Sequence, residues 1–237
     1  MDHNRRLGLW SLCLTAALLG GCASGPNAHP QDPLEPMNRS VTRFNDTVDE
    51  AVLKPVATGY RDTLPHPVRT GVGNFFGNLR DAWSVVNGVL QGRPKEAAQD
   101  FMRVNVNTVF GLGGLIDIAS DMGIERTTMD FGQTMGRWGM PSGAYVVLPL
   151  FGPSTVRDTV GLVVDSQADP VSQGGADVAL RNSGQVLRAV DTRASLLGTT
   201  DLLEQAALDK YTFVRDAYLQ RRDEQVNGPR KEERYDE

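Results

Sequence analysis

Cys22 carries the clearest chemistry in this chain of 237 residues. It follows the run LLGG at 18–21, whose small residues let the chain lie extended in a peptidase groove. A cysteine thiolate at that position is the nucleophile that takes up a diacylglyceryl group. A basic head and a mostly apolar stretch at 7–19 precede it, which is the layout of a lipoprotein signal peptide. We therefore expect removal of residues 1–21, and both a diacylglycerol and an N-acyl chain such as palmitate on Cys22.

The residues around Cys22 also indicate where the anchored protein resides. Ala23 stands where an aspartate would retain a lipoprotein in the inner membrane, so we expect the outer membrane. The apolar stretch at 7–19 is shorter than the roughly 20 residues that a spanning helix needs. A buried N-terminal helix of a cytosolic protein is the alternative interpretation. Each buried CH₂ of an acyl chain contributes about 0.8 kcal/mol, so several chains on one residue give a lasting anchor.

The mature chain offers little of the chemistry that an enzyme needs. His29 and His66 both lie beside prolines, and neither has a second His or Cys at the spacing of a zinc site. Ser154 stands in Gly-Pro-Ser-Thr, which does not match a nucleophile elbow, and we expect it to be a helix N-cap. The run GLGG at 111–114 lacks the further residues of a phosphate-binding loop and predicts a helix junction. We expect neither a metal nor a non-covalent cofactor.

Asp158 and Asp165 are the one pair of carboxylates with suggestive spacing. They are seven residues apart, about two helical turns, so they share a helix face. Paired carboxylates can act as acid and base, but more often they form a solvated face or line a polar cavity. The sequence leaves these interpretations open.

Charge and cysteine content exclude some classes of partner and of stabilisation. The net charge is −5, and removal of two arginines and one aspartate with the leader makes it −6, so we expect no nucleic-acid partner. The only cysteines are Cys13, in the leader, and Cys22. The mature domain therefore has no disulfide, and its stability must come from packing.

Apolar residues at three- and four-residue steps predict helices along most of the chain. The first follows an N-cap at Asp32 and is ended by Pro55. The other predicted helices lie at 72–90, 95–110, 115–119, 154–165 and 176–222, the last interrupted near 198–201. Residues 130–153 are rich in Gly and Pro, and 145–151 is expected to be extended. Amphipathic helices of this kind either lie in one leaflet of a membrane or meet in a soluble core.

The domain organisation follows from these patterns. We expect a lipidated N-terminus and flexible tether at 22–31, one all-α domain at 32–222, and a charged, disordered tail at 223–237.

Three separated blocks carry a resemblance to a known family. The chain reads DPLEPMNRSVTRFN at 32–45, NVNTVFGLGGLIDIA at 105–119 and FGQTMGRWGMPSGAYVVLPLFGPSTVRDTVGLVVD at 131–165. In this order after Cys22, the blocks closely resemble the MlaA (VacJ) family of outer-membrane lipoproteins, and the resemblance extends to about residue 220. Met37, where the family has an aromatic, and Ala144, where it commonly has proline, are mild departures.

The resemblance implies a fold, a path and partners. The fold is an all-α, ring-like domain embedded in the inner, periplasmic leaflet of the outer membrane, with amphipathic helices and Gly/Pro-rich junctions. A central polar channel would let mislocalised phospholipids leave the outer leaflet, because burying a charged headgroup in hydrocarbon is very costly. The implied partners are phospholipid, a trimeric porin and a soluble periplasmic carrier similar to MlaC. The implied result is lipid asymmetry.

The polar members of the matching blocks are candidates for lining the channel or contacting lipid: Asn38, Arg39, Asn45, Asn105, Asn107, Asp117, Arg157, Asp158 and Asp165. Each has a structural role as its alternative. Gly111, Gly113 and Gly114 are candidate hinges, because glycine tolerates the backbone changes of a gate. For the whole chain, the alternatives to transport are a phospholipid hydrolase and a structural lipoprotein that scaffolds porins.

Overall fold

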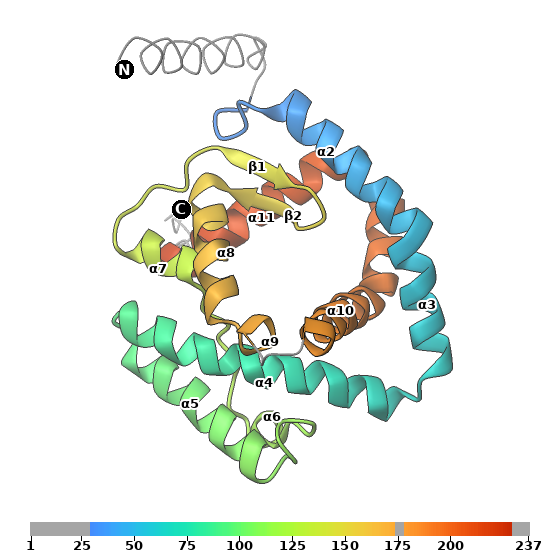
Figure 1. Cartoon of the computed structure of the whole chain (residues 1–237). Coiled ribbons are helices and arrows are strands. Elements are labelled where there is room, and N and C mark those ends of the chain that lie inside the picture. Colours follow the sequence, from blue (N-terminus) through green and yellow to red (C-terminus); the bar gives the residue numbers. More distant parts are fainter. Residues whose placement is uncertain (1–28, 174–177, 229–237) are drawn as a thin grey trace, which may run out of the picture.

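The computed structural model describes residues 29–173 and 178–228, and the side chains of 201–206 are not described. Cys22 and the leader lie outside this part of the chain. The helices and strands form a single ring-like domain that is almost entirely helical, as expected (Figure 1). The elements of the N-terminal half are α2 (Glu35–Val48), a π-helix (Asp49–Leu53), α3 (Lys54–Thr63), α4 (His66–Leu90), α5 (Pro94–Val109) and α6 (Ile118–Asp121). Those of the C-terminal half are α7 (Phe131–Arg137), β1 (Tyr145–Leu148), β2 (Gly152–Thr155), α8 (Val156–Ala168), α9 (Pro170–Gln173), α10 (Val178–Ala206) and α11 (Lys210–Asn227).

The first helix does not end at Pro55, so that prediction is wrong. Proline has no N–H, and its ring clashes with the carbonyl four residues earlier in a regular α-helix. Here the preceding turn is a π-helix, in which the N–H of Lys54 bonds to the carbonyl of Asp49, five residues back. The wider turn lets the chain continue through Pro55 into α3. One long, nearly continuous helical segment results, and it curves along one side of the ring (Figure 1).

Asp32 is not the N-cap of this helix. The N-cap is Leu34, which makes no side-chain capping bond, and α2 begins at Glu35. Asp32 is fully buried instead, and accepts hydrogen bonds from Asn38 and Tyr211.

Helices α4 and α5 form an antiparallel pair whose shared face is polar. Asn78 donates to Thr108 at 3.0 Å, and Ser84 donates to Asp100 at 2.5 Å. Arg103, with no exposed side-chain surface, donates to Asp81 at 3.2 Å. The glycine at 88 lets the two helices approach, because a Cβ there would lie 2.9 Å from the Cβ of Ala97. Hydrogen bonds and ion pairs therefore hold this pair together where a soluble protein would place leucines.

A short antiparallel hairpin is the only sheet in the described part of the chain. Tyr145 pairs with Thr155 and Leu148 pairs with Gly152. The extended segment predicted at 145–151 thus ends at Leu148, and Pro149 falls in the turn, where its missing N–H is harmless.

The C-terminal helices differ from prediction at two points. Helix α10 runs through 198–201 without the predicted interruption, and the break comes later, at 207–209, where Asp209 caps α11. Helix α11 continues to Asn227, so the ordered domain extends past the predicted boundary at 222 and residues 223–227 are not a disordered tail. Its last turn is held because Val226 is buried and Arg137 donates to the carbonyl of that residue. The remainder of the predicted tail lies outside the described residues.

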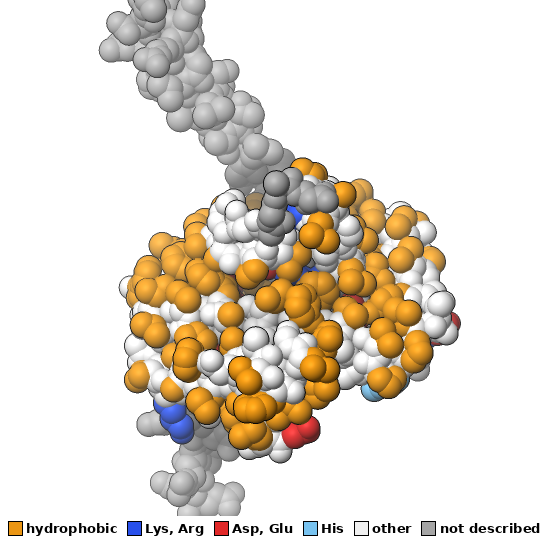
Figure 2. Space-filling view, turned by 60° about the horizontal axis from the view of Figure 1, so that its bottom comes forward, with side chains coloured by type: hydrophobic (Ala, Val, Ile, Leu, Met, Phe, Trp, Pro, Cys, Tyr) orange, Lys and Arg blue, Asp and Glu red, His pale blue; other side chains and the backbone are white. Residues whose placement is uncertain are grey.

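The distribution of polar and apolar side chains between interior and surface is the reverse of that in an ordinary soluble domain. Among the described residues, fully buried polar and charged residues outnumber fully buried hydrophobic ones. Large apolar side chains are exposed on most helices, including Phe44 on α2, Val89 on α4 and Phe101 on α5, each more than 50% exposed. Figure 2 shows such side chains spread over one face of the molecule with few charges among them. The amphipathic stripes therefore point largely outward. No helix in the described part of the chain is long and apolar enough to cross a membrane.

Arg103→Met tests how much the buried pair between α4 and α5 contributes. The substitution keeps the length of the side chain but leaves the buried Asp81 with one fewer cation, so we expect a loss of about 3–5 kcal/mol in the free energy of unfolding. Denaturant unfolding in detergent, followed by circular dichroism, measures it. Asp62→Asn, which breaks an exposed pair with Arg61, is the control and should leave the unfolding midpoint unchanged. Equal midpoints for Arg103→Met and the control would contradict the assignment.

Candidate functional site

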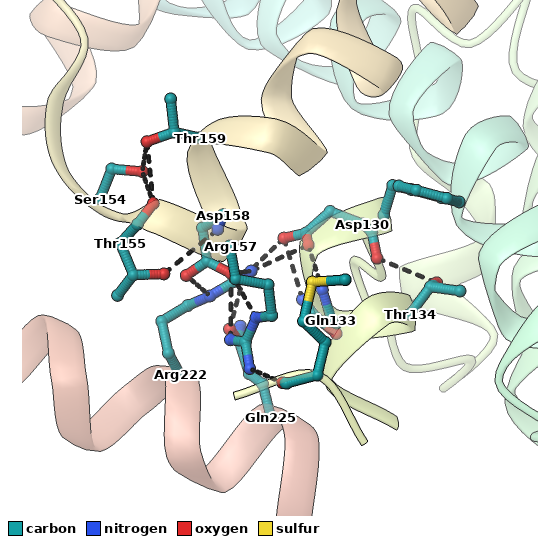
Figure 3. Close-up of polar contacts among 12 residues, drawn as sticks. Asp130, Gln133, Thr134, Ser154, Thr155, Arg157, Asp158, Thr159, Arg222 and Gln225 are labelled. Atoms are coloured by element: carbon teal, nitrogen blue, oxygen red, sulfur yellow. Dashed lines mark hydrogen bonds and ion pairs between the residues drawn. The ribbon is translucent and has the colours of Figure 1, made fainter. Parts of the chain in front are cut away.

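One buried polar cluster joins three elements that are distant in sequence. Arg222 of α11 pairs with Asp130, the N-cap of α7, at 2.6 Å and with Asp158 of α8 at 2.8 Å (Figure 3). Tyr218 donates to the second oxygen of Asp158 at 2.8 Å. Burial opposes ionisation of Asp158, but the hydrogen bond and charge of Arg222 outweigh it and lower the pKa of Asp158. The carboxylate is therefore charged and fully engaged.

Arg157 is buried beside the same cluster. Its Nε donates to Asp158 at 3.0 Å, and its neighbour Thr155, rather than the expected Ser154, caps α8 by accepting from the N–H of Asp158. Gly161 allows α7 and α8 to meet, because a Cβ there would lie 2.5 Å from the backbone nitrogen of Gly132. The cluster is thus set by a close helix crossing.

Asp165 shares a cavity with Asp158, as their spacing suggested. The cavity has a volume of about 240 Å³, and Leu162 and Phe151 also line it. One oxygen of Asp165 accepts from the indole of Trp83 at 2.7 Å and from the N–H of Phe131 at 3.0 Å. Burial raises the pKa of Asp165, and the hydrogen bonds offset this only in part. The two carboxylates therefore differ: Asp158 is paired with arginines, whereas Asp165 receives only neutral donors.

Asn38 is a clamp for the hairpin. Its side chain donates to the carbonyl of Tyr145 at 3.0 Å and accepts from the N–H of Val147 at 2.9 Å. Asn45 makes the same two-sided contact with Leu148 and Leu150 two turns later. These two asparagines form hydrogen bonds with backbone groups at the outer edge of β1 and attach this strand to α2.

Arg39 joins α2 to the start of α11. It pairs with Glu35 and with Asp209, both at 2.7 Å, and its guanidinium lies 4.3 Å from the centre of the Tyr211 ring.

Asn107 and Asp117 belong to a second buried cluster, between α5 and α6. Asp117 caps α6, which begins at Ile118 rather than at the predicted Leu115. Nη2 of Arg103 lies 2.8 Å from each of the two carboxylate oxygens of Asp117. Asn107 donates to Asp117 at 2.9 Å. Burial works against ionisation of Asp117, but hydrogen bonds from Ser120 and Asn107 lower its pKa to about 2. Asn105 lies apart from the cluster and donates only to the carbonyl of Phe101.

The three candidate hinge glycines lie in the turn between α5 and α6, beside this cluster. Gly113 and Gly114 have φ of 73° and 94°, which side chains other than glycine rarely adopt. Gly111 is tightly enclosed, because a Cβ there would lie 2.1 Å from the carbonyl oxygen of Ile116.

Local sequence patterns did not indicate the arginines that organise the buried clusters: Arg103, Arg222, and Arg215, which pairs with the buried Asp32 at 3.3 Å. These arginines lie outside the three blocks quoted above and have no distinctive spacing, and their partners are up to 183 residues away. The hydroxyl of Ser154 hydrogen-bonds to the carbonyl of Thr155 and to the hydroxyl of Thr159, and it has no histidine partner among the described residues. No group of residues suited to a metal ion is found in the described ranges either.

These features define an all-helical, single-domain protein with charged clusters inside and apolar side chains outside. Comparison with known proteins narrows the class: the MlaA lipoprotein family matches residues 30–225. The chain belongs to the MlaA lipoprotein family.

Several relatives make the similarity specific. The chain is 38% identical to the "Intermembrane phospholipid transport system lipoprotein MlaA" of Shigella flexneri and of Escherichia coli K12, over 94% of this chain and 90% of each relative. The protein of the same name from Haemophilus influenzae is 38% identical over 90% of this chain and 88% of its own length. A solved structure, described as the structural basis for maintenance of bacterial outer membrane lipid asymmetry, is 38% identical with a TM-score of 0.72, covering 83% of this chain and 99% of that chain.

The pH dependence of stability tests the assignment of Asp117. Its pKa in the folded state, about 2, lies below the ordinary 3.8, so its carboxylate stabilises the fold above pH 4 and this contribution disappears as the pH falls to about 2. We expect wild type to lose about 2 kcal/mol more than Asp117→Asn over this range, measured by denaturant unfolding at each pH. Asp121→Asn removes an exposed carboxylate of the same short helix and should keep the wild-type loss. Parallel curves for wild type and Asp117→Asn would contradict the assignment.

Proposed function

We propose that this chain is an outer-membrane lipoprotein that removes mislocalised phospholipids from the outer leaflet and passes them to a periplasmic carrier, and so maintains lipid asymmetry. The observation that carries the proposal is the inverted exposure of the domain: many of its polar and charged residues are buried, while large apolar side chains on most of its helices are exposed. Membership of the MlaA lipoprotein family supports the same function.

The apolar exterior suits a domain lying in one leaflet. Val156, Val160 and Val163 form one stripe of α8 and are 51%, 53% and 60% exposed. Water would oppose such a surface, whereas lipid tails accept it. Embedded in the periplasmic leaflet of the outer membrane, the ring needs no spanning helix.

The polar interior provides the path for a headgroup. Two neighbouring cavities, of about 240 and 140 Å³, share Asp165 in their walls. Moving a charged headgroup through hydrocarbon is costly, and polar walls lower that cost without any covalent step. We infer that the chain is not an enzyme, since transport alone accounts for these features.

The lipid anchor on Cys22 delivers and retains the domain in its leaflet. The chain is held from its first described residues, since Gln31 accepts a hydrogen bond from the N–H of Tyr145 at 2.7 Å and Asp32 is buried. The seven residue-to-residue steps from Cys22 to His29 reach at most about 25 Å, so the acyl chains keep the ring close to the bilayer.

The trimeric porin and the soluble carrier similar to MlaC remain proposed partners. The relatives named as lipoproteins of an intermembrane phospholipid transport system support the existence of further components. A ring in the periplasmic leaflet needs a companion that reaches the outer leaflet and a soluble acceptor for its lipid, and these two partners fill those positions.

A matched pair of tryptophan substitutions tests transport through the interior. Leu162→Trp adds an indole to the wall of the 240 Å³ cavity, whereas Val163→Trp adds it to an exposed side chain of the same helix that does not line this cavity. We expect phospholipid to accumulate in the outer leaflet with Leu162→Trp only, measured by the access of an added phospholipase to intact cells. Equal accumulation with both substitutions would contradict an interior path. Release of fatty acid from phospholipid by the purified wild-type protein would instead favour a hydrolase.

Gly113→Val tests the predicted hinge. Gly113 and Gly92 are both in turns with positive φ, 73° and 67°, and a Cβ at either has open space around it. Valine should therefore cost about 1–2 kcal/mol of stability at both positions, measured by thermal unfolding. If the turn at 111–114 moves during transport, only Gly113→Val raises outer-leaflet phospholipid. Wild-type asymmetry in both variants would remove the hinge role.

A further inference from the structure

Arg80 is a cation that lines a cavity. No carboxylate of the described residues lies within ion-pair distance of it. It lies on the same face of α4 as Phe76 and Trp83, and together they line the cavity of about 140 Å³. The other arginines nearby are engaged: Arg126 pairs with Asp81 at 2.9 Å, and Arg188 of α10 pairs with Asp169 at 2.9 Å. Among these three arginines, Arg80 is the one without an ion pair to a carboxylate of the described residues.

The surroundings make that position attractive to an anion. Although the side chain of Arg80 is exposed, it opens into a concave space with protein on several sides. Desolvation by the protein around this space and the positive charges of Arg126 and Arg188 lower the pKa of Arg80. A negatively charged group between them would relieve the repulsion, and a guanidinium binds phosphate oxygens through two parallel hydrogen bonds.

Asp165 offers a complementary acceptor in the same cavity. Its Oδ1 receives both hydrogen bonds, from Trp83 and from the N–H of Phe131, while its Oδ2 accepts none from the described residues. It also has no cation within ion-pair distance there, in contrast to Asp169, which Arg188 occupies with both of its terminal nitrogens. The cavity therefore presents one available positive charge and one available negative charge.

An apolar cavity adjoins this polar one. Its volume is about 570 Å³, it shares Phe76 with the polar cavity, and its wall is formed mainly by Val72, Phe75, Leu115, Val171, Leu180 and Leu187. A ligand that fills both needs a hydrocarbon portion next to its charges. Neither a free phosphate nor a free amine meets that requirement.

We propose that these two cavities bind one zwitterionic phospholipid with a primary amine, its phosphate on Arg80, its ammonium on Asp165 and an acyl chain in the apolar cavity. This assignment rests on the proposed function and adds a headgroup preference to it. A lipid with phosphate but no amine pairs with Arg80 but leaves the half-buried Asp165 without a cation, and therefore binds less tightly.

Binding of short-chain lipids to the full acylated protein in detergent tests the assignment. The probes are dihexanoyl phosphatidylethanolamine and dihexanoyl phosphatidylglycerol, titrated by calorimetry. We expect Arg80→Gln to weaken both lipids about tenfold to a hundredfold, the effect of one charge-assisted hydrogen bond, with partial recovery in Arg80→Lys. Asp165→Asn keeps the acceptor for Trp83 and should weaken only the amine-bearing lipid. Arg69→Gln, on the same helix but outside both cavities, should bind both as wild type does.

The outcomes separate the headgroup site from transport itself. Unchanged binding in Arg80→Gln, or equal weakening of both lipids in Asp165→Asn, overturns the proposed site. Unfolding midpoints equal to wild type show that lost binding is not lost folding. Outer-leaflet phospholipid is measured in parallel, in cells that carry Arg80→Gln and in cells that lack the protein. Normal lipid asymmetry in the cells that lack the protein would refute the proposed function, whatever the binding result.

Discussion

The pairing of buried arginines with aspartates is the constraint on which the rest of this structure depends. An isolated charge away from water costs several kcal/mol, and removing one member of a buried pair typically costs about 3–5 kcal/mol. The described part of the domain contains three such clusters, around Arg103, Arg215 and Arg222. Arg103 joins the consecutive helices α4, α5 and α6. Arg215 and Arg222 join segments that are far apart in sequence, so these two arginines hold the ends of the ring together. In this domain, buried ion pairs hold the helices together, as a leucine-rich core does in a soluble domain.

An apolar environment outside the ring explains why the helices are joined in this way. In lipid, apolar side chains gain nothing by meeting one another, so helix contacts rely on close packing and on hydrogen bonds between helices. Helices α4 and α5 show both, with Gly88 against Ala97 and the ion pair of Arg103 with Asp81. The same contacts would be a poor substitute for hydrophobic packing in water. The polar interfaces and the exposed apolar stripes are therefore two consequences of one environment.

Local patterns predicted the helices well and the long-range contacts poorly. The break between α4 and α5 follows directly from Gly92 and Pro94, whereas the continuation through Pro55 depends on a π-turn that no composition rule signals. Asn38 belongs to one of the three blocks that resemble the family. Its role in holding the hairpin is visible only in the structure, because its partner Tyr145 lies 107 residues further along the chain. Arg222 has partners 64 and 92 residues away, and periodicity along one helix carries no information about them. The prediction that Asp32 caps the first helix was wrong for the same reason. Asp32 forms hydrogen bonds with Asn38 and with the distant Tyr211, and these contacts outweigh its local preference for an N-cap position.

Asp158 and Asp165 show how a functional surface emerges from such a structure. They lie two turns apart on one helix and line one cavity, so sequence spacing treats them alike. Arg222 and Tyr218 occupy Asp158 fully, and its pKa falls; Asp165 keeps one oxygen without a described donor, and its pKa rises. The first carboxylate holds the fold, and only the second has capacity left for a ligand. Arg188 and Arg80 differ in the same way. Arg188 is paired with Asp169, whereas Arg80 has no ion pair with a described carboxylate. In a domain that buries so many paired charges, the groups available to a ligand are those that the fold leaves unpaired.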